Sequence, residues 1–307
     1  MSEIVILGVF VADTAYRADR QPRMGETILG KSFALGPGGK GSNQAVASAM
    51  AGGDIAFVSR IGRDPFGDMA MAAWDKAGVV SGAVERAGEA TGAAYIFIDD
   101  ASGDNAIIIA PGAAAGIDAA FVDARADLIA GAMVFVTQLE QPMGAAMRAL
   151  YIARGGGTTT VLNPAPAAVL PEGMLGLCDW VTPNETEAEA LTGIAVADLD
   201  GARAAGDALL AAGVARGAVL TLGGQGALLH MADRSVHVPA FDAGLVVETT
   251  GAGDAFNGGF ATALAEGQDP EQAVRFGCAT ASISVTRAGT APSMPARAEI
   301  EALLAKG

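Results

Sequence analysis

The sequence contains few cysteines, histidines and aromatic residues. Of its 307 residues, 2 are cysteine, 2 are histidine and 5% are aromatic. This cysteine content excludes a disulfide-stapled scaffold and favours a reducing compartment. Cys178 and Cys278 lie far apart in no metal-ligand spacing, so we expect them to pack in the core. His230 and His237 fall in late strand patterns without metal-like partners, and we expect both to be structural.

Basic residues are also scarce. The 19 Lys and Arg residues are outnumbered by 34 Asp and Glu residues, giving a formal net charge of −15. Without a basic patch, a nucleic-acid partner is not expected. Every apolar run is shorter than the roughly 20 residues that span a bilayer, and the chain enters the apolar stretch Ile4–Leu7 without a basic leader. We therefore expect a cytoplasmic protein with no membrane contact.

Strand-like and helix-like patterns alternate along most of the chain. Apolar runs typical of buried strands occupy residues 4–7, 55–58, 133–137, 158–162, 180–182 and 218–222. Helical patterns follow most of them, at 42–50, 66–77, 142–153, 185–191 and 198–212, and again at 255–265, 270–285 and 296–305. This alternation predicts an α/β fold: a Rossmann-like, mostly parallel sheet with helices on both faces, in a single domain over residues 1–307.

Two segments depart from that rhythm. Residues 93–98 and 106–109 flank a polar loop with no helix between them, which predicts an antiparallel hairpin. Residues 10–35 show no long helical period and several turn residues. We expect segments 10–35 and 93–110 to form a small second sheet, and residues 227–231 and 236–238 to form a late antiparallel pair.

The stretch Gly251-Ala252-Gly253-Asp254 precedes the apolar spacing of a helix face. Free N–H groups at a helix N-terminus attract anions, and glycine lets a phosphate come close. Asp254 in the first turn has two possible roles. It is either a helix cap or a general base acting beside a transferring phosphoryl group.

Further polar residues follow the predicted strands at their carboxyl ends, where such sheets bind ligands. They are Asp13, Glu140, Asn163, Asn184 and the turn 221–226. Taken alone, each of these residues is explained as a helix cap or a solvated loop residue. The stretch Gly36–Gly41 is expected to be a glycine loop; it fits neither the position of a dinucleotide fingerprint nor a Walker A sequence.

Four motifs together resemble the ribokinase group of the PfkB carbohydrate-kinase family, nearly end to end. They are Gly38–Ala45, Asn163–Ala167, Thr182–Glu189 and Thr249–Gly258. The resemblance implies a ribokinase-like fold in which the small sheet is a β lid over the sugar. It implies ATP-dependent phosphorylation of the primary 5-hydroxyl of D-ribose, with homodimerisation through the lid.

The resemblance also assigns roles to individual residues. Asp254 would be the general base and contact the sugar, and the N–H groups of Gly251, Ala252 and Gly253 would form an anion hole. The positions that match sugar-contacting residues are Asp13, Gly39, Lys40, Asn43 and Glu140. Those that match nucleotide-contacting residues are Asn184, Thr221, Gly223, Gly224, Gln225, Gly226, Gly253 and Cys278.

Metal sites are implied in the same way. Glu187 matches the acid that organises Mg²⁺ through water. A monovalent cation, K⁺, would be held mostly by backbone carbonyls, from Glu248, Thr250, Ser284, Arg287, Gly289 and Ser293.

Two residues differ from the family pattern. Val11 stands where ribokinases have an asparagine, so the sugar loses a polar partner, and Glu248 stands where aspartate is usual. Because of Val11, the second interpretation is a kinase of the same family for another small sugar, polyol or nucleoside. A non-catalytic sugar-binding protein is the third reading, and the intact Gly-Ala-Gly-Asp sequence argues against it.

Overall fold

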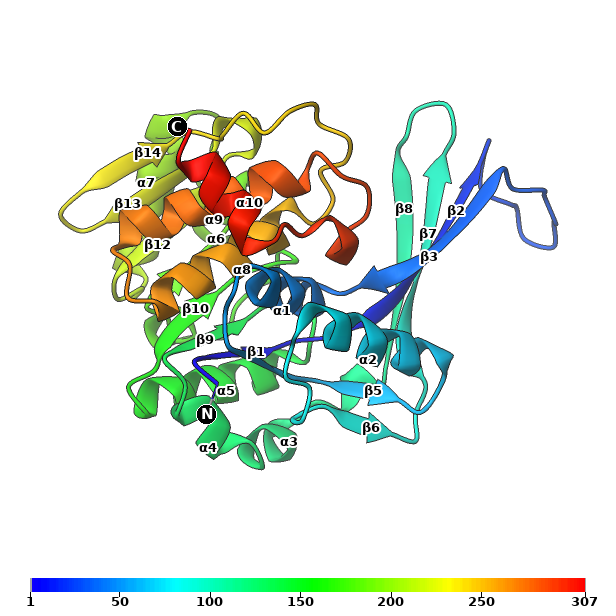
Figure 1. Cartoon of the computed structure of the whole chain (residues 1–307), viewed down its shortest axis with the longest axis horizontal. Helices are drawn as coiled ribbons and strands as arrows, with labels where there is room; N and C mark the ends of the chain where they lie inside the picture. Colours follow the sequence, from blue (N-terminus) through cyan, green and yellow to red (C-terminus); the bar gives the residue numbers. More distant parts are fainter. Residues whose placement is uncertain (1, 307) are drawn as a thin grey trace.

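An eight-stranded sheet runs through the middle of the structure, a computed structural model that describes residues 2–306 (Figure 1). In spatial order its strands are β14 (Ser235–Val238), β13 (Ala227–Met231), β12 (Gly217–Thr221), β11 (Trp180–Val181), β10 (Thr159–Leu162), β9 (Val134–Thr137), β1 (Ile4–Leu7) and β4 (Ile55–Val58). The strands from β12 to β4 are parallel, whereas β13 is antiparallel to both its neighbours. The predicted fold class and the late antiparallel pair are therefore confirmed.

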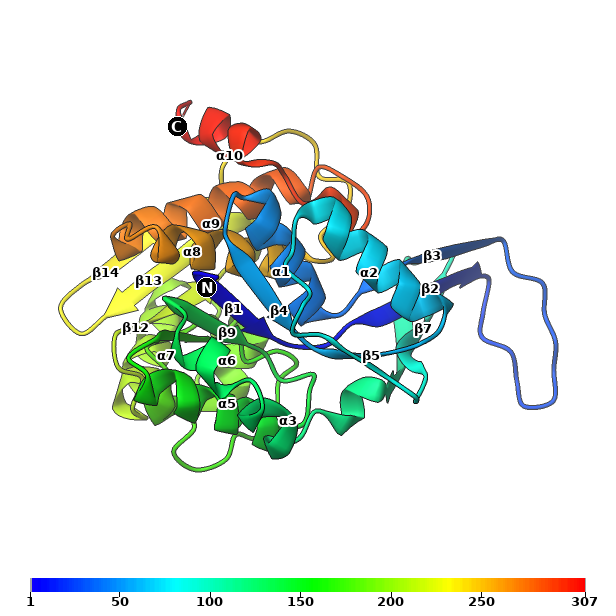
Figure 2. The same ribbon diagram turned by 60° about the horizontal axis from the view of Figure 1, so that its bottom comes forward.

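Helices cover both faces of this sheet (Figure 2). One face carries α1 (Lys40–Met50), α2 (Pro65–Ala77), α8 (Ala252–Ala265), α9 (Pro270–Ser284) and α10 (Arg297–Leu304). The other carries α3 (Ala119–Asp123), α4 (Ala126–Ala130), α5 (Met143–Gly155), α6 (Glu185–Thr192) and α7 (Leu199–Ala211). The central strands are buried on both faces, which is why they read as continuous apolar runs. None of the helices within residues 2–306 combines the length and the apolar character needed to cross a bilayer.

A separate four-stranded sheet projects from the main body (Figure 1). Its order is β3 (Ser32–Gly38), β2 (Val11–Ala18), β7 (Thr91–Asp99) and β8 (Asn105–Gly112). The hairpin of β7 and β8 is antiparallel, as expected, and β2 pairs in parallel with β7. We call this sheet the lid.

The prediction of a glycine loop at residues 36–41 is wrong. Residues 36–38 complete β3 because they pair with residues 11–13 of β2, and Lys40 already begins α1. Only Gly39 lies between them, at φ +90°, a backbone conformation that glycine adopts readily. A Cβ there would lie 2.5 Å from the Val9 carbonyl oxygen.

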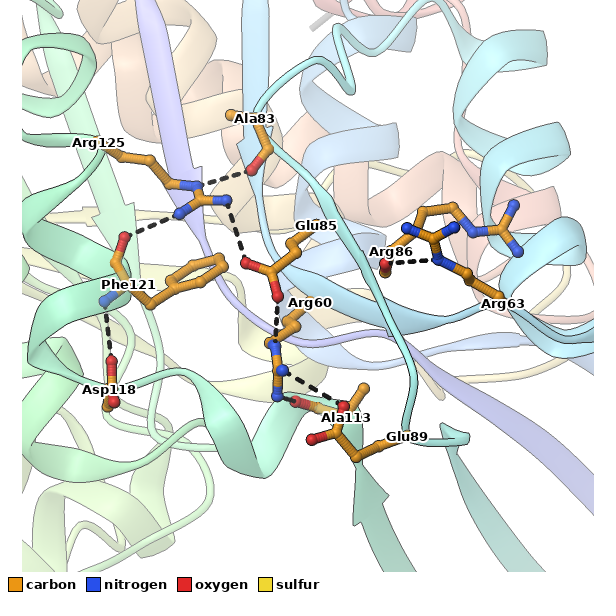
Figure 3. A network of polar contacts seen from close by, with 10 residues as sticks. All are labelled: Arg60, Arg63, Ala83, Glu85, Arg86, Glu89, Ala113, Asp118, Phe121 and Arg125. Carbon is orange, nitrogen blue, oxygen red and sulfur yellow. Dashed lines mark hydrogen bonds and ion pairs between the residues drawn. The ribbon is translucent and has the colours of Figure 1, made fainter.

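The sequence patterns also missed a two-stranded parallel sheet, β5 (Arg60–Gly62) and β6 (Glu85–Ala87). Its charged residues hold the root of the lid (Figure 3). Arg60 donates from Nε to Glu85 at 2.9 Å and from Nη1 to the Ala113 carbonyl at 3.3 Å, directly after β8. The Arg125 guanidinium stacks 3.6 Å above the Phe121 ring and reaches Glu85 at 3.9 Å. Such short, charged strands lack the apolar period that reveals a strand in sequence.

Helices α1 and α8 approach each other closely because small residues meet at their contact. A Cβ built on Gly258 would lie 2.5 Å from the Ala47 Cβ and 2.7 Å from the Gln44 carbonyl oxygen. No side chain fits there without displacing α1. This close approach brings the first turns of both helices to one place at the edge of the sheet.

We expect Gly258→Ala to lower the free energy of unfolding by about 1–3 kcal/mol, because the added methyl group overpacks the contact. Gly144→Ala is the matched control, since a Cβ on this exposed helical glycine meets nothing within 4 Å. That change should stabilise the protein by roughly 0.5–1 kcal/mol. Denaturant unfolding measures both, and equal effects of the two substitutions would contradict the packing argument.

Candidate active site

Polar side chains from helices α1, α6 and α8, from strand β12 and from the segments after β10 and β11 meet at the carboxyl edge of the main sheet. They line a cavity of about 150 Å³. Its lining residues are Lys40, Asn163, Ala165, Thr182, Asn184, Glu187, Thr221, Gly251, Gly253, Asp254 and Asn257. Of the strand-end residues singled out in the sequence, Asn163, Asn184 and Thr221 therefore gather around the first turn of α8, as expected of parallel strands.

Asp254 lies in the first turn of α8 and is only 7% exposed. Its carboxylate does not cap the helix, because the N-cap is Gly251 at φ +84° and receives no side-chain bond. Instead, Asn43 Nδ2 donates to Oδ2 at 3.0 Å, and Gln44 Nε2 donates to Oδ1 at 3.1 Å. Burial raises the pKa of Asp254, while the Lys40 ammonium and the two amides oppose this rise. The capping alternative is thereby excluded.

The N-terminus of α8 is open to solvent beside that carboxylate. Among the described residues, the N–H groups of Gly251 and Gly253 find no hydrogen-bond partner, whereas the Ala252 N–H donates to the Thr249 carbonyl at 3.1 Å. A Cβ on Gly253 would meet nothing within 4 Å, so the space in front of the helix is free. Open N–H groups at a helix N-terminus form a ready anion site.

Asp13 does not lie at the carboxyl end of β1, where the sequence placed it. It belongs to the lid strand β2 and pairs with Gly36. A Cβ on Gly38 would lie 2.2 Å from Asp13 Oδ2, so this glycine makes room for the carboxylate. Burial raises the pKa of Asp13 to about 6, and the charge of Asp254 adds to the rise. The lid therefore delivers an acid close to Asp254.

Glu140 follows β9 and faces the start of α1. Its Oε2 accepts the Lys40 N–H at 2.7 Å. Burial raises the pKa of Glu140 to about 7, although the Lys40 charge and N–H lower it. Like Asp13, Gly39 and Asn43, Glu140 does not line the cavity at the first turn of α8.

A larger and more apolar cavity of about 450 Å³ adjoins the first. The expected nucleotide contacts Asn184, Thr221, Gly223, Gly224, Gly226, Gly253 and Cys278 all line it, and Gln225 does not. Burial raises the pKa of the Cys278 thiol to about 12, so this cysteine is a neutral wall residue.

Both histidines make hydrogen bonds within the protein. The Gln225 carbonyl bonds His237 at 2.7 Å, and His230 bonds Asp207 at 2.9 Å, as structural histidines do.

Asn184 and Glu187 form a capping box at the start of α6. Asn184 Oδ1 accepts the Glu187 N–H at 2.8 Å, and Glu187 Oε2 accepts the Asn184 N–H at 2.9 Å. Both residues also line the smaller cavity. Desolvation raises the pKa of Glu187. Within residues 2–306, no three His, Cys, Asp or Glu side chains are grouped as a metal-ion cluster.

The two segments expected to hold a monovalent cation lie against each other. Glu248 donates its N–H to the Val285 carbonyl at 3.1 Å, and Glu248 Oε2 accepts the Gly289 N–H at 2.8 Å. Ser284 and Ser293 donate their hydroxyls to nearby carbonyls, and Arg287 pairs with Glu299. Thr250 is exposed at the end of the first segment.

Several buried amides of the site escaped the sequence analysis. Gln44 contacts Asp254 directly, Gln138 donates to Gln44 at 2.6 Å, and Asn257 accepts the Thr182 hydroxyl at 2.6 Å. The available signal was the position of Gln44 and Gln138 next to residues already singled out. An amide that will be buried looks the same in sequence as one in solvent.

Comparisons with known proteins agree with this geometry. The family model for pfkB family carbohydrate kinases matches residues 1–297. A ribokinase of Haemophilus influenzae is 38% identical over 297 residues, covering 96% of each chain. A deoxyribokinase of Salmonella typhi is 35% identical over 295 residues, covering 95% of each. The solved structure of Arabidopsis thaliana ribokinase complexed with ribose and ATP superposes with a TM-score of 0.94 at 31% identity, covering 99% of this chain and 98% of that one.

We expect Glu140→Gln to raise the free energy of unfolding above that of wild type at high pH and to leave it nearly unchanged at low pH. Because the folded-state pKa of Glu140 is raised to about 7, the folded protein binds more protons than the unfolded chain between pH 4.5 and 7. This carboxyl therefore costs stability as pH rises through that window. The gain should be about 1–2 kcal/mol at pH 8 and near zero at pH 4.5.

Denaturant unfolding at both pH values measures the difference. Glu172→Gln, at an exposed loop carboxylate, is the control and should show no comparable change with pH. A gain for Glu140→Gln that is the same at pH 4.5 and pH 8 would contradict the raised pKa.

Proposed function

We propose that this chain, which belongs to the pfkB family of carbohydrate kinases, transfers the γ-phosphoryl group of ATP to the 5-hydroxyl of D-ribose. One observation carries the proposal. A buried carboxylate, Asp254, stands beside an open helix N-terminus that lies between the two cavities. A base next to an anion site is what direct phosphoryl transfer to a hydroxyl requires. The likeness to a ribokinase complexed with ribose and ATP supports both substrates.

In this proposal the sugar lies under the lid, against Asp254. Asp13 and Glu140 accept hydroxyl hydrogens, and the Gly39 backbone and the Lys40 side chain complete the contact. Asn43 supports this placement, because its Oδ1 is buried and has no partner within the described residues. A hydroxyl that donates to this oxygen removes the cost of leaving it unpaired.

Asp254 then accepts the proton of the reacting hydroxyl as the oxygen attacks the γ-phosphorus, and the bond from this phosphorus to the β,γ-bridging oxygen breaks to release ADP. Gly251 and Gly253 N–H groups, with the N-terminus of α8, stabilise the negative charge on the transferring group. Ala252 N–H, which now bonds Thr249, must change partner to take part. The Lys40 ammonium lines the same cavity and adds a positive charge.

The larger cavity suits the nucleotide. Its glycine turn after β12 allows close approach, since a Cβ on Gly224 would meet nothing within 4 Å. Glu187 lines the smaller cavity and is a hard oxygen donor suited to hold Mg²⁺ through water. When bound, Mg²⁺ supplies charge neutralisation on the phosphates. A K⁺ site formed by segments 248–250 and 284–293 completes the proposal.

Val11 supports a second candidate, a kinase for another small sugar, polyol or nucleoside. Val11 is 5% exposed, begins β2 and lies two residues before Asp13, so both side chains face the same side of the strand. Valine offers no hydrogen bond to a sugar hydroxyl. A 35% identical relative is a deoxyribokinase. An acceptor that lacks a hydroxyl there is therefore the competing substrate.

We expect Asp254→Asn to lower kcat by roughly 10²–10⁴-fold, because the amide cannot accept the proton. ADP release from ATP and Mg²⁺ measures it, with and without K⁺, across D-ribose, 2-deoxyribose, other pentoses, fructose and nucleosides. Asp207→Asn, on a carboxylate that bonds His230 away from both cavities, is the control and should keep wild-type turnover.

Each result decides between the readings. Preference for D-ribose supports the first candidate, and preference for 2-deoxyribose or another acceptor supports the second. Wild-type turnover by Asp254→Asn would exclude this residue as the base. Failure to phosphorylate any acceptor would favour a non-catalytic binding protein.

We also propose that the protein is a homodimer through the lid. The face of the lid opposite Asp13 carries exposed apolar side chains, at Tyr16, Phe33, Leu35 and Ile108. A face of this kind favours burial against a second copy. The two free cysteines support a cytoplasmic location.

Ile108→Lys should convert the dimer to monomers, because a charge on this face would be buried without a partner. Sedimentation velocity measures the change. Val169→Lys, at a position that is 95% exposed on a loop outside the lid, is the control and should leave the dimer intact. A wild-type protein that sediments as a monomer would contradict the proposal.

A further inference from the structure

Gln44 is a fully buried amide whose hydrogen-bonding atoms are all bonded within the protein. Its Nε2 donates to Asp254 Oδ1 at 3.1 Å and to Asn163 Oδ1 at 3.0 Å. Its Oε1 accepts from Gln138 Nε2 at 2.6 Å. Gln44 is 0% exposed and lines neither cavity. It therefore has no contact to offer a substrate.

The neighbouring Asn43 differs in this respect. Its Nδ2 also donates to Asp254, at 3.0 Å, but its Oδ1 is left without a partner within the described residues. Asn43 can therefore hydrogen-bond the sugar and Asp254 at the same time, whereas Gln44 can hydrogen-bond Asp254 but not the sugar. Held at both oxygens, the carboxylate cannot rotate about its Cβ–Cγ bond without losing one of these bonds.

The orientation of the Gln44 amide is fixed by its other two partners, Asn163 and Gln138. Asn163 Nδ2 donates at 3.0 Å to the Thr182 carbonyl, which can only accept. Asn163 must therefore present its oxygen to Gln44, and Gln44 must present its NH₂ group to Asn163 and to Asp254. Gln138 donates to the oxygen that remains. A flipped Gln44 would set its oxygen against the oxygens of Asp254 and Asn163, and its nitrogen against the nitrogen of Gln138.

We propose that Gln44 is a positioning residue, which fixes the plane of the Asp254 carboxylate through an amide chain anchored at the Thr182 carbonyl. This inference rests on the proposed function, in which Asp254 is the base. Four charged groups also face Asp254: Lys40 from α1, Asp13 from β2, Glu140 after β9 and Glu187 from α6. Substituting Gln44 leaves all four in place, so a changed pH profile reports the lost N–H donor.

The test is Gln44→Met, which keeps the length of the side chain and removes the donor. We expect kcat to fall roughly 10- to 100-fold, the equivalent of one hydrogen bond to a charged group. The sugar KM should change less than about threefold, because Gln44 does not touch the sugar. The acidic limb of kcat/KM should move to higher pH, because a carboxylate with fewer donors is protonated more readily.

Ser48→Ala is the matched control. Ser48 is also buried on α1, and its hydroxyl bonds Thr262 of α8 at 3.0 Å, away from Asp254. This variant should lose stability and keep the wild-type pH profile. If Gln44→Met lowers kcat without moving the acidic limb, or if Ser48→Ala moves it equally, the role is structural and the inference is wrong.

Gln138→Met tests the same chain one residue further away, and decides the question if Gln44→Met does not fold. It removes the donor to Gln44 Oε1, so the acidic limb should move in the same direction, with a loss of roughly 3- to 10-fold in kcat. An unmoved limb overturns the inference. If wild type is active and Gln44→Met has the same kcat and pH profile, the inference is wrong and the proposed function stands. If wild type shows no turnover, both the inference and the proposed function are wrong.

Discussion

The close contact between α1 and α8 is the constraint on which the site depends. Gly258 lets the two helices meet at a distance that no side chain would permit. As a result, two consecutive amides of α1, from Asn43 and Gln44, reach the carboxylate in the first turn of α8. A buried carboxylate needs such donors, because burial alone favours its protonated form. Packing between two helices thus sets the chemistry of Asp254.

The main sheet and the lid bring the remaining groups to that carboxylate from two sides. Parallel strands end at one edge, so residues at the ends of β10, β11 and β12 line one cavity with the first turn of α8. Asp13 arrives separately, on the lid, where Gly38 leaves room for it. The Arg60 and Glu85 pair holds the root of the lid to the main body (Figure 3). An acceptor bound under the lid therefore meets groups from two different sheets.

Burial of four carboxylates lowers the stability of the protein without ligands. Asp13, Glu140, Glu187 and Asp254 all have raised pKa values, mainly because each is desolvated. The Lys40 charge lowers the pKa of Glu140, Glu187 and Asp254, and its N–H also bonds Glu140. Buried carboxylates with raised pKa values are typical of binding sites for polar ligands, because a sugar's hydroxyls and a nucleotide's metal ion can bind the carboxylates.

The sequence by itself determined the α/β class, the lid hairpin, the helix that opens at Gly251 and the family. Each is a local signal, carried by apolar period, turn residues or a contiguous motif. It could not determine that Gly36–Gly38 extends a strand or that β5 and β6 pair. Nor could it find Gln44, whose bond to Asp254 joins residues 210 positions apart. Only the tertiary structure decided these, because the direction of a buried amide is set by partners that folding brings together.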